Sequence, residues 1–293
     1  MNPPKLLGSN VSRVKEEKVE HIKKEEIYDL LKNCDILERA IVLVGISSGL
    51  FASDIMALKI KDFKNGYDPE SKITTLPLTR TKTGVKFVTF LSPEASQAVI
   101  DYLKFRSNEA TPKQHDSGNN GHLFIPRKIS KKYNNDDPST EELRKLTEVG
   151  FTRMHARLAE KANKINPNGW NVVRSHQMRK FFFTTLMQPD TGCDFFFVDR
   201  LMGHKPTGSN NSYFKCDPVA MKEEYKRCIP YLTISKESVS VIDSKEYKEL
   251  LAEKEIYKKE AIESKIERYE YTEMKAKVDE IAKRITDSID DWL

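Results

Sequence analysis

The spacing of apolar residues changes at residues 72–91, from the repeat of a helix to the alternation of strands. The apolar positions are Ile73, Leu76 and Leu78, then Val85, Phe87, Val88 and Phe90, on either side of Thr83 and Gly84. Two such runs joined by a short turn predict a β-hairpin. Elsewhere apolar residues recur every three or four positions, which indicates helices packed on a core. The chain is therefore predicted to be mainly α-helical with a small antiparallel β-sheet, an α+β fold.

Helical spacing and end signals predict seven helical regions along the chain. They are residues 24–47, Asp54–Lys59 with Ser53 as its N-cap, Pro93–Arg106, Thr140–Lys164, His176–Met187, Asp194–Met202 and Asn211–Arg227. Residues 107–139 are rich in Asn, Ser, Asp, Gly and Lys, which is typical of a long surface loop. The phenylalanine triplets at 181–183 and 195–197 are interpreted as core rather than as platforms for nucleic-acid bases.

Three regions of the chain differ in composition. Residues 1–24 are polar and rich in Lys and Glu, and are predicted to be a lead-in arm. Residues 25–232 contain the hairpin and the predicted packed helices, and we expect one domain there. Residues 233–293 are predicted to form one long charged helix with a coiled-coil-like stripe, formed by Met274, Val278, Ile281, Ile285, Ile289 and Leu293. The stripe could pack on the chain's own body or on a partner, since either would bury it.

The charge of the chain favours a polyanionic partner for residues 25–232. The net charge is +5, while the region after Lys236 has more acidic than basic residues, so the positive excess lies in the body. No apolar run is long enough for a membrane helix and the first residues contain no apolar core of a signal peptide, which predicts an intracellular location. Four scattered cysteines without CxxC spacing predict free thiols and no metal site.

Five residues suggest phosphoryl transfer without a metal ion. His176 and Arg179 are three positions apart and share one face of a predicted helix. His204 follows a glycine, Tyr213 comes nine positions later, and Lys82 lies at the turn of the hairpin. A tyrosine can attack phosphorus to give a covalent phosphotyrosine, while a guanidinium holds two phosphate oxygens. The histidines can hydrogen-bond the phosphate or move the phenol proton, and Lys82 can act as general acid for the leaving oxygen.

The order and spacing of these motifs resemble those of the tyrosine recombinase family. Residues 48–58 (SGLFASDIMAL) are similar to the family's first motif, in which Asp54 matches an acidic position. The resemblance covers about residues 25–230 and also includes the lysine hairpin, the His-x-x-Arg pair, the Gly-His pair and the tyrosine. It implies the family's catalytic-domain fold, double-stranded DNA as partner, and a tetramer of chains on two DNA sites. It also implies that neither a metal ion nor a nucleotide cofactor is needed.

Phe51 departs from the family pattern, because the first arginine of the family falls on this position. Losing one guanidinium at a transferring phosphoryl group costs on the order of 10³-fold or more in rate. Arg80 and Arg174 are candidates for a replacement arginine, since either guanidinium could hold the phosphate in the same way. Together with Lys205 they are also the predicted DNA contacts.

Four functions remain open from the sequence. The first is a site-specific recombinase or integrase that forms a 3′-phosphotyrosine. The second, favoured by Phe51, is a catalytically inactive DNA-binding relative. The third is an enzyme like type IB topoisomerases, which share much of this chemistry, and the fourth is a coiled-coil adaptor that only the tail supports.

Overall fold

The computed structural model describes residues 22–108, 114–115, 118–164, 173–204, 217–235 and 274–275. The chain divides into two compact units, Met1–Ser235 and Lys236–Leu293. In the second unit the two described residues, Met274 and Lys275, are helical and exposed. The rest of the predicted tail helix, its apolar stripe and the lead-in arm up to residue 21 lie outside the described residues.

The described part of the first unit is mostly helical with one two-stranded sheet. Its elements in chain order are α1 (Lys24–Lys32), α2 (Ile36–Ser48), α3 (Ala52–Ala57), α4 (Ile60–Gly66), β1 (Thr74–Thr79), β2 (Lys86–Leu91), α5 (Pro93–Asn108), η2 (Pro138–Arg144), α6 (Glu148–Lys161), α7 (Ser175–Leu186), η3 (Pro189–Thr191), α8 (Phe195–Leu201) and α9 (Pro218–Leu232). The predicted mainly helical α+β fold class is confirmed.

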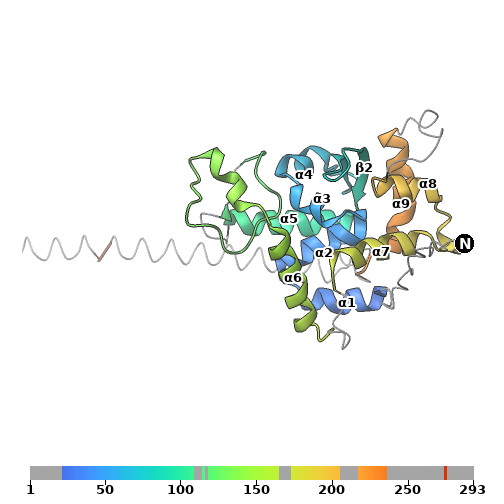
Figure 1. The fold of residues 1–293 in the computed structure, drawn as a ribbon, viewed down its shortest axis with the longest axis horizontal. Helices are drawn as coiled ribbons and strands as arrows, with labels where there is room; N and C mark the ends of the chain where they lie inside the picture. The colour runs from blue at the N-terminus through green and yellow to red at the C-terminus, as the bar shows by residue number, and fades with distance from the viewer. Residues whose placement is uncertain are drawn as a thin grey trace, which may run out of the picture. The chain divides into compact units, whose positions relative to one another are not determined.

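Helix α2 forms the centre of the core. Every residue from Ala40 to Ser48 is buried, because the helix is apolar on all faces and packs against both α5 and α7. Figure 1 shows α2 in the middle of the domain. Its N-terminus is capped by Asp35, whose carboxylate accepts a hydrogen bond from the Glu38 N–H at 2.9 Å. Its C-terminus ends at Gly49 in the left-handed conformation.

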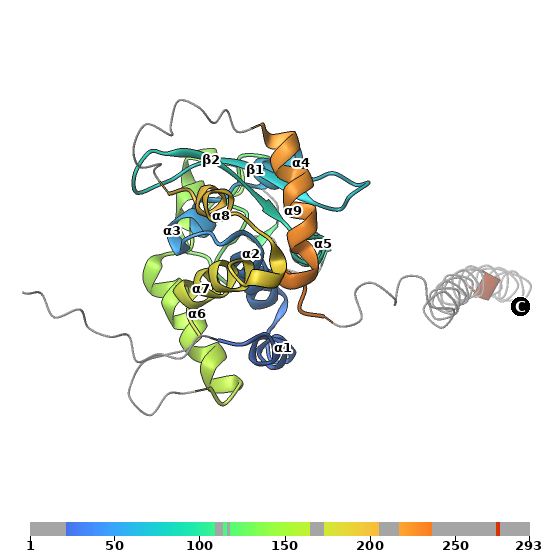
Figure 2. The ribbon, with the colours of Figure 1, turned by 90° about the vertical axis from the view of Figure 1, so that its right-hand side faces the viewer.

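The predicted hairpin is confirmed and lies on one side of the helices. Strands β1 and β2 pair antiparallel, from Thr74 opposite Leu91 to Thr79 opposite Lys86. One face of the sheet packs on the core, since four side chains that share it are buried: Thr74, Leu76, Thr89 and Leu91. Helix α8 packs against β2 and α4 against β1, as Figure 2 shows for α8. This packing holds the hairpin turn near the loops that follow α2 and α8.

Helix α9 is anchored to the centre of the core by one buried tyrosine. The Tyr225 hydroxyl donates to the Ser47 carbonyl oxygen at 2.7 Å and lies 2.9 Å from the Ser47 hydroxyl. Burial raises the pKa of this phenol, so it stays protonated as a donor. The helix predicted at Asn211–Arg227 corresponds to α9, which begins at Pro218 behind the cap Asp217 and runs to Leu232. Residues 211–216 of the prediction lie outside the described residues.

Two other helix predictions were wrong at their boundaries. The expected helix Thr140–Lys164 is divided into η2 and α6, because Thr147 leaves the helical conformation and caps α6 by accepting from the Gly150 N–H. The short helix expected at Asp54–Lys59 is α3, which starts two residues earlier with Phe51 at its N-cap. It stops before Leu58, whose carbonyl oxygen accepts from the Leu123 N–H at 2.8 Å.

The two phenylalanine triplets differ in burial. Phe181 and Phe182 lie in the core, as predicted. The prediction was wrong for Phe195 and Phe196, which are 49% and 54% exposed. Both stand in the first turn of α8, and the ring of Phe195 meets that of Phe183 edge-on at 6.2 Å. Only the inner face of this short helix, with Val198 and Leu201, reaches the core.

Candidate active site

Arg179 is the buried centre of the candidate site. It lies on α7 with 3% of its surface exposed. Its guanidinium donates to the carbonyl oxygens of Gly49 and Met202, the latter at 3.0 Å. A further N–H faces Nε2 of His204 at 2.8 Å. These bonds use three of the five N–H donors of a guanidinium, so donors remain for an incoming anion.

His204 is oriented by an acidic partner on α8. Its Nδ1 is hydrogen-bonded to the carboxylate of Asp199, while its Nε2 faces Arg179. Carboxylates accept and guanidiniums donate, so the imidazole carries its proton on Nδ1 and accepts at Nε2. Asp199 was not predicted from the sequence. An acidic residue five positions before a Gly-His pair was the available signal.

Two glycines allow the backbone to reach Arg179. Gly49 and Gly203 have φ angles of 64° and 68°, a region that side chains disfavour. A Cβ at Gly203 would lie 2.9 Å from the ring of Phe87, and one at Gly49 would lie 2.5 Å from the ring of Phe182. The chain therefore turns sharply after α2 and after α8, which directs the Gly49 and Met202 carbonyls to the same guanidinium.

The hairpin turn is tied to α3 by Asp54. Its buried carboxylate accepts from the Thr81 N–H at 3.0 Å. Lys82 is the next residue, and its side chain is exposed. Asp54 therefore holds the base of the turn that presents Lys82, and it joins the first motif to the hairpin.

Phe51 contacts two arginines. The guanidinium carbon of Arg179 lies 3.7 Å from the centroid of its ring, and that of Arg80 lies 4.2 Å from it. Arg80 also donates to the Gly203 carbonyl oxygen at 2.7 Å. The position at which the resemblance expects an arginine thus holds an aromatic ring with a guanidinium from the hairpin over it.

The electrostatics of the site favour a neutral histidine and an anion. Partial desolvation, then the charges of Arg174 and Arg179, lowers the pKa of His176. Its imidazole, which remains accessible to solvent, is therefore neutral at pH 7. Burial, then the nearby Arg80, lowers the pKa of Arg179 to about 9. The negative charges of Asp54 and Asp199 act against this shift and raise the pKa of Arg179. Two cations this close are complementary to a phosphate.

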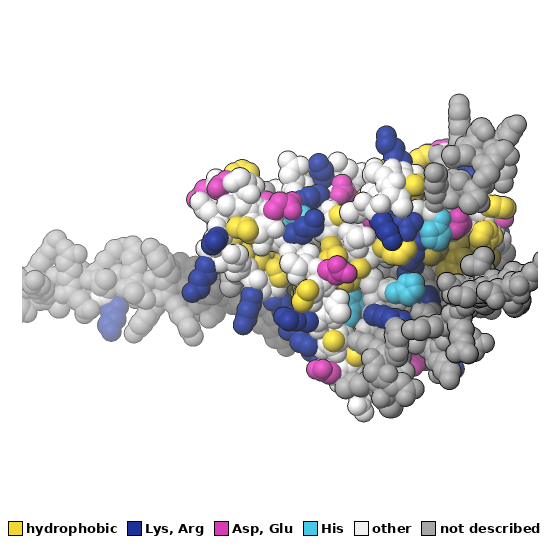
Figure 3. All heavy atoms as spheres, viewed as in Figure 1, with side chains coloured by type: hydrophobic (Ala, Val, Ile, Leu, Met, Phe, Trp, Pro, Cys, Tyr) yellow, Lys and Arg dark blue, Asp and Glu magenta, His cyan; other side chains and the backbone are white. Residues whose placement is uncertain are grey.

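Histidine side chains lie among Lys and Arg side chains on the face shown in Figure 3, in the region of α7 and α8. His176 is exposed at the start of α7, and His204 follows α8. The face in Figure 3 therefore combines histidine side chains with positive charge at the surface.

A model of the phage integrase family matches residues 18–218, which is more than half of the chain. The chain belongs to the phage integrase family. Its resemblance to the tyrosine recombinases is thereby confirmed at the level of the family. No curated protein sequence matches the chain.

Several solved structures of integrases and recombinases are similar to this family member. A XerA recombinase is 20% identical with a TM-score of 0.46, over 72% of this chain and 65% of the other. A Tn1549 transposon integrase in complex with circular intermediate DNA is 21% identical with a TM-score of 0.43, over 71% and 67%. A lambda integrase dimer bound to a COC′ core site is 14% identical with a TM-score of 0.43, over 69% and 62%. The chain thus spans about two thirds of the length of these proteins.

The structure brings together some of the candidate residues of this integrase-family chain. Arg179, His204, Arg80 and Phe51 are in contact, and Asp54 bonds the residue before Lys82. His176 and Arg174 stand at the N-terminus of the same helix as Arg179. The proposed nucleophile Tyr213 and the proposed DNA contact Lys205 lie outside the described residues.

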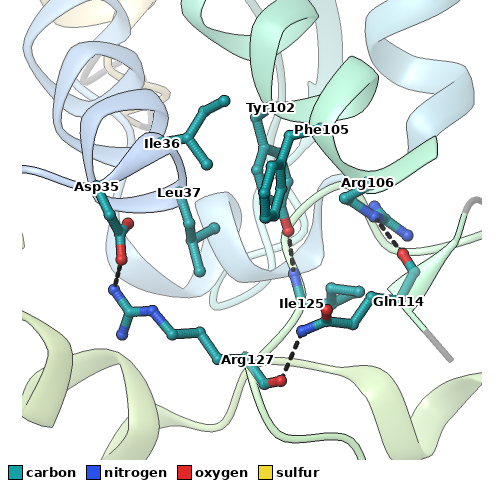
Figure 4. Close-up of a pocket in the computed structure, with 9 residues that line it drawn as sticks. All are labelled: Asp35, Ile36, Leu37, Tyr102, Phe105, Arg106, Gln114, Ile125 and Arg127. Carbon is teal, nitrogen blue, oxygen red and sulfur yellow. Dashed lines mark hydrogen bonds and ion pairs between the residues drawn. The ribbon is translucent and has the colours of Figure 1, made fainter. Parts of the chain in front are cut away.

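A separate cavity of about 330 Å³ lies between the start of α2 and the end of α5. It is lined by Asp35, Ile36, Leu37, Tyr102, Phe105, Arg106, Gln114, Ile125 and Arg127. Figure 4 shows Arg127 reaching the carboxylate of Asp35 and the Tyr102 hydroxyl beside the Ile125 N–H. None of the candidate active-site residues lines this cavity.

Three further findings concern only the residues that the structure describes. No group of three or more His, Cys, Asp and Glu side chains is placed to hold a metal ion. No described helix has the length and apolar character needed to cross a membrane. Cys34, Cys193 and Cys228 are free thiols, and Cys216 lies outside the described part.

Proposed function

We propose that this chain is a site-specific DNA recombinase or integrase that cuts and rejoins duplex DNA through Tyr213. The observation that carries the proposal is the hydrogen-bonded set of Arg179, His204 and Asp199, with the Asp54-anchored lysine turn held on α3. Its donors and cations suit a transferring phosphoryl group. Membership of the phage integrase family supports the same class of reaction.

The proposed reaction exchanges one phosphodiester bond for another. The phenolic oxygen of Tyr213 attacks the scissile phosphorus, and the bond from phosphorus to the 5′ oxygen breaks. The phenol proton passes to the neutral imidazole of His176, and the Lys82 ammonium protonates the departing 5′ oxygen. Arg179 holds non-bridging oxygens, with His204 beside it as a further hydrogen-bonding group. Rejoining reverses these transfers, so no cofactor is consumed.

The proposed partner is double-stranded DNA, bound by a tetramer of chains on two sites. XerH and lambda integrase structures, solved with difH substrate and on a core site, support DNA as the partner. We assign catalysis to residues 25–232, with Arg80, Arg174 and Lys205 among the DNA contacts. Residues 1–24 are an arm and residues 233–293 a helical tail. Such a protein acts where the DNA is, inside a cell.

A catalytically inactive DNA-binding protein is the second candidate, and Phe51 favours it. A phenylalanine ring has no donor for a phosphate oxygen. The fold would still present its cationic groups to the DNA backbone, which accounts for most of the affinity of such proteins.

Covalent capture tests the proposal. The full chain and its Tyr213→Phe variant are each incubated with a pool of nicked duplexes, in which the central sequence is randomised from one duplex to the next. The products are then separated on a denaturing gel. We expect a protein–DNA adduct with the parent chain and none with Tyr213→Phe. Sequencing the captured DNA would give the recognition site.

Three other outcomes would distinguish the alternatives. An equal adduct with Tyr213→Phe would reject this nucleophile. Salt-sensitive binding without any adduct, also after Phe51→Arg, would identify the inactive relative. Relaxation of supercoiled plasmid without strand exchange would indicate a topoisomerase.

A further inference from the structure

Arg80 reaches the candidate site from a different element than Arg179. It belongs to the loop between β1 and β2, whereas Arg179 belongs to α7, and both guanidiniums lie over the ring of Phe51. Phe51 itself is only partly buried, so this arrangement is near the surface. The ring acts as a common platform, because its face attracts cations.

The backbone of Arg80 is fixed by the hairpin. Its N–H donates to the Val85 carbonyl oxygen at 2.8 Å, and its own carbonyl accepts from the Gly84 N–H at 2.9 Å. The next residue, Thr81, is bonded to Asp54. Arg80 is therefore held at the base of the turn, so that its side chain is directed towards the site before DNA binds.

The two arginines bind consecutive carbonyl groups. Arg179 donates to Met202 and Arg80 donates to Gly203, immediately before His204. Their guanidiniums are thus placed together around one turn of the backbone. Each keeps N–H donors beyond these hydrogen bonds, since a guanidinium has five.

Charge repulsion between these arginines is a further indication that the two guanidiniums bind an anion together. Arg80 is the second cause, after burial, that lowers the pKa of Arg179. The two neighbouring carboxylates, Asp54 and Asp199, already make hydrogen bonds to Thr81 and His204. A phosphate within reach of both guanidiniums would offset this repulsion by its attraction to each of them.

We propose that Arg80 supplies the second guanidinium for the scissile phosphate and that Phe51 holds it in place of the expected arginine. The inference rests on the proposed recombinase function. Arg174, the other candidate, stands at the N-terminus of α7, whereas the guanidinium of Arg80 lies over Phe51 together with that of Arg179.

The test measures adduct formation on DNA from the randomised pool, or on the sequence that the parent chain or Phe51→Arg captures from it. The proteins compared are the parent chain, Phe51→Arg, Arg80→Ala, Arg80→Lys and Phe51→Arg/Arg80→Ala. We expect Arg80→Ala to slow adduct formation on the order of 10³-fold. Arg80→Lys should recover part of this lost rate, and Phe51→Arg/Arg80→Ala should recover most of it.

Arg227→Ala is the matched control, because it removes an exposed guanidinium on α9 that bonds Glu224. Its rate should stay near that of the parent chain.

A methylphosphonate at the scissile position separates contact with the phosphate from positioning of His204. It replaces one charged oxygen by a methyl group, so a guanidinium that binds this oxygen becomes less important. We expect the ratio of the parent rate to the Arg80→Ala rate to shrink towards one on this substrate. The active fraction of each preparation affects this ratio equally on both substrates, so a partly folded variant does not change the comparison between phosphate and methylphosphonate.

The outcomes distinguish this inference from the function on which it rests. An unchanged rate in Arg80→Ala would overturn the role of Arg80, as would an equal loss on phosphate and methylphosphonate. An adduct with Phe51→Arg but none with the parent chain would also overturn it, while the recombinase chemistry would stand. No adduct with any variant would reject the proposed function itself.

Discussion

Arg179 binds acceptors of its own protein with much of its guanidinium when DNA is absent. The Gly49 and Met202 carbonyls hold it from two sides, and His204 accepts a third hydrogen bond. These bonds satisfy a buried charge that would otherwise be costly. They also keep the side chain in one orientation, so a phosphate meets a preorganised donor group.

His176 leads to a prediction about pH. Its pKa lies below the ordinary value of 6.5, since burial and two arginines disfavour the imidazolium. If the neutral imidazole accepts the phenol proton, adduct formation falls as pH drops through this lowered pKa. We expect a plateau near pH 7 and an acid limb below pH 6.5, measured as the rate of adduct formation. His176→Gln should be slower and lack this acid limb; an acid limb unchanged in the variant would exclude His176 as the base.

The elements around the site are connected by turns rather than by regular structure. Arg179 and Phe51 lie where four segments meet: the end of α2, the start of α3, the hairpin turn and the end of α8. Gly49 is the residue on which this meeting depends, because it both ends α2 and supplies a carbonyl to Arg179.

Gly49→Ala should destabilise the domain strongly. The substitution adds a Cβ at positive φ and 2.5 Å from the Phe182 ring. We expect a loss of roughly 2–4 kcal/mol in the free energy of unfolding, measured by urea denaturation. Gly84→Ala is the matched control, since its φ of 69° is similar but no atom lies within 4 Å. It should cost only about 1 kcal/mol. Equal losses would show that the contact with Phe182 does not matter.

The whole chain combines a positively charged domain with a more acidic tail. A chain that holds DNA mainly by phosphate contacts must lose affinity as salt rises, because bound counterions are released on association. The positive excess lies in the first of the two compact units, Met1–Ser235, so this unit should carry the DNA binding.

Salt titration of DNA binding is the prediction at this scale. With six or more phosphate contacts, affinity should fall at least about 10³-fold between roughly 50 and 200 mM salt, measured by fluorescence anisotropy. Tyr213→Phe should bind like the parent chain, since it removes one hydroxyl and no charge. A DNA affinity that does not change with salt concentration would instead support the coiled-coil adaptor.

Local spacing determined much of this protein in advance. The alternation at residues 72–91 predicted the hairpin, and the helical repeats predicted most helices. Such patterns are local because each side chain's direction follows from its position in the repeat. For the same reason the spacing of His176 and Arg179 was readable in the sequence, and the family resemblance added the remaining candidates.

Long-range contacts and local turns decided the geometry of the candidate site and one helix boundary. Nothing near Phe51 in the sequence indicates that Arg80, 29 positions away, lies over its ring beside Arg179. Asp199 likewise became visible only when α8 ended in a turn that brings His204 back to it. The break at Thr147 depended on a cap that competes with helix continuation. The contacts of Arg80 and Arg179 with Phe51 arise from packing between segments far apart in the chain. The Asp199–His204 bond and the Thr147 cap depend on local turns, which a repeat of apolar residues does not encode.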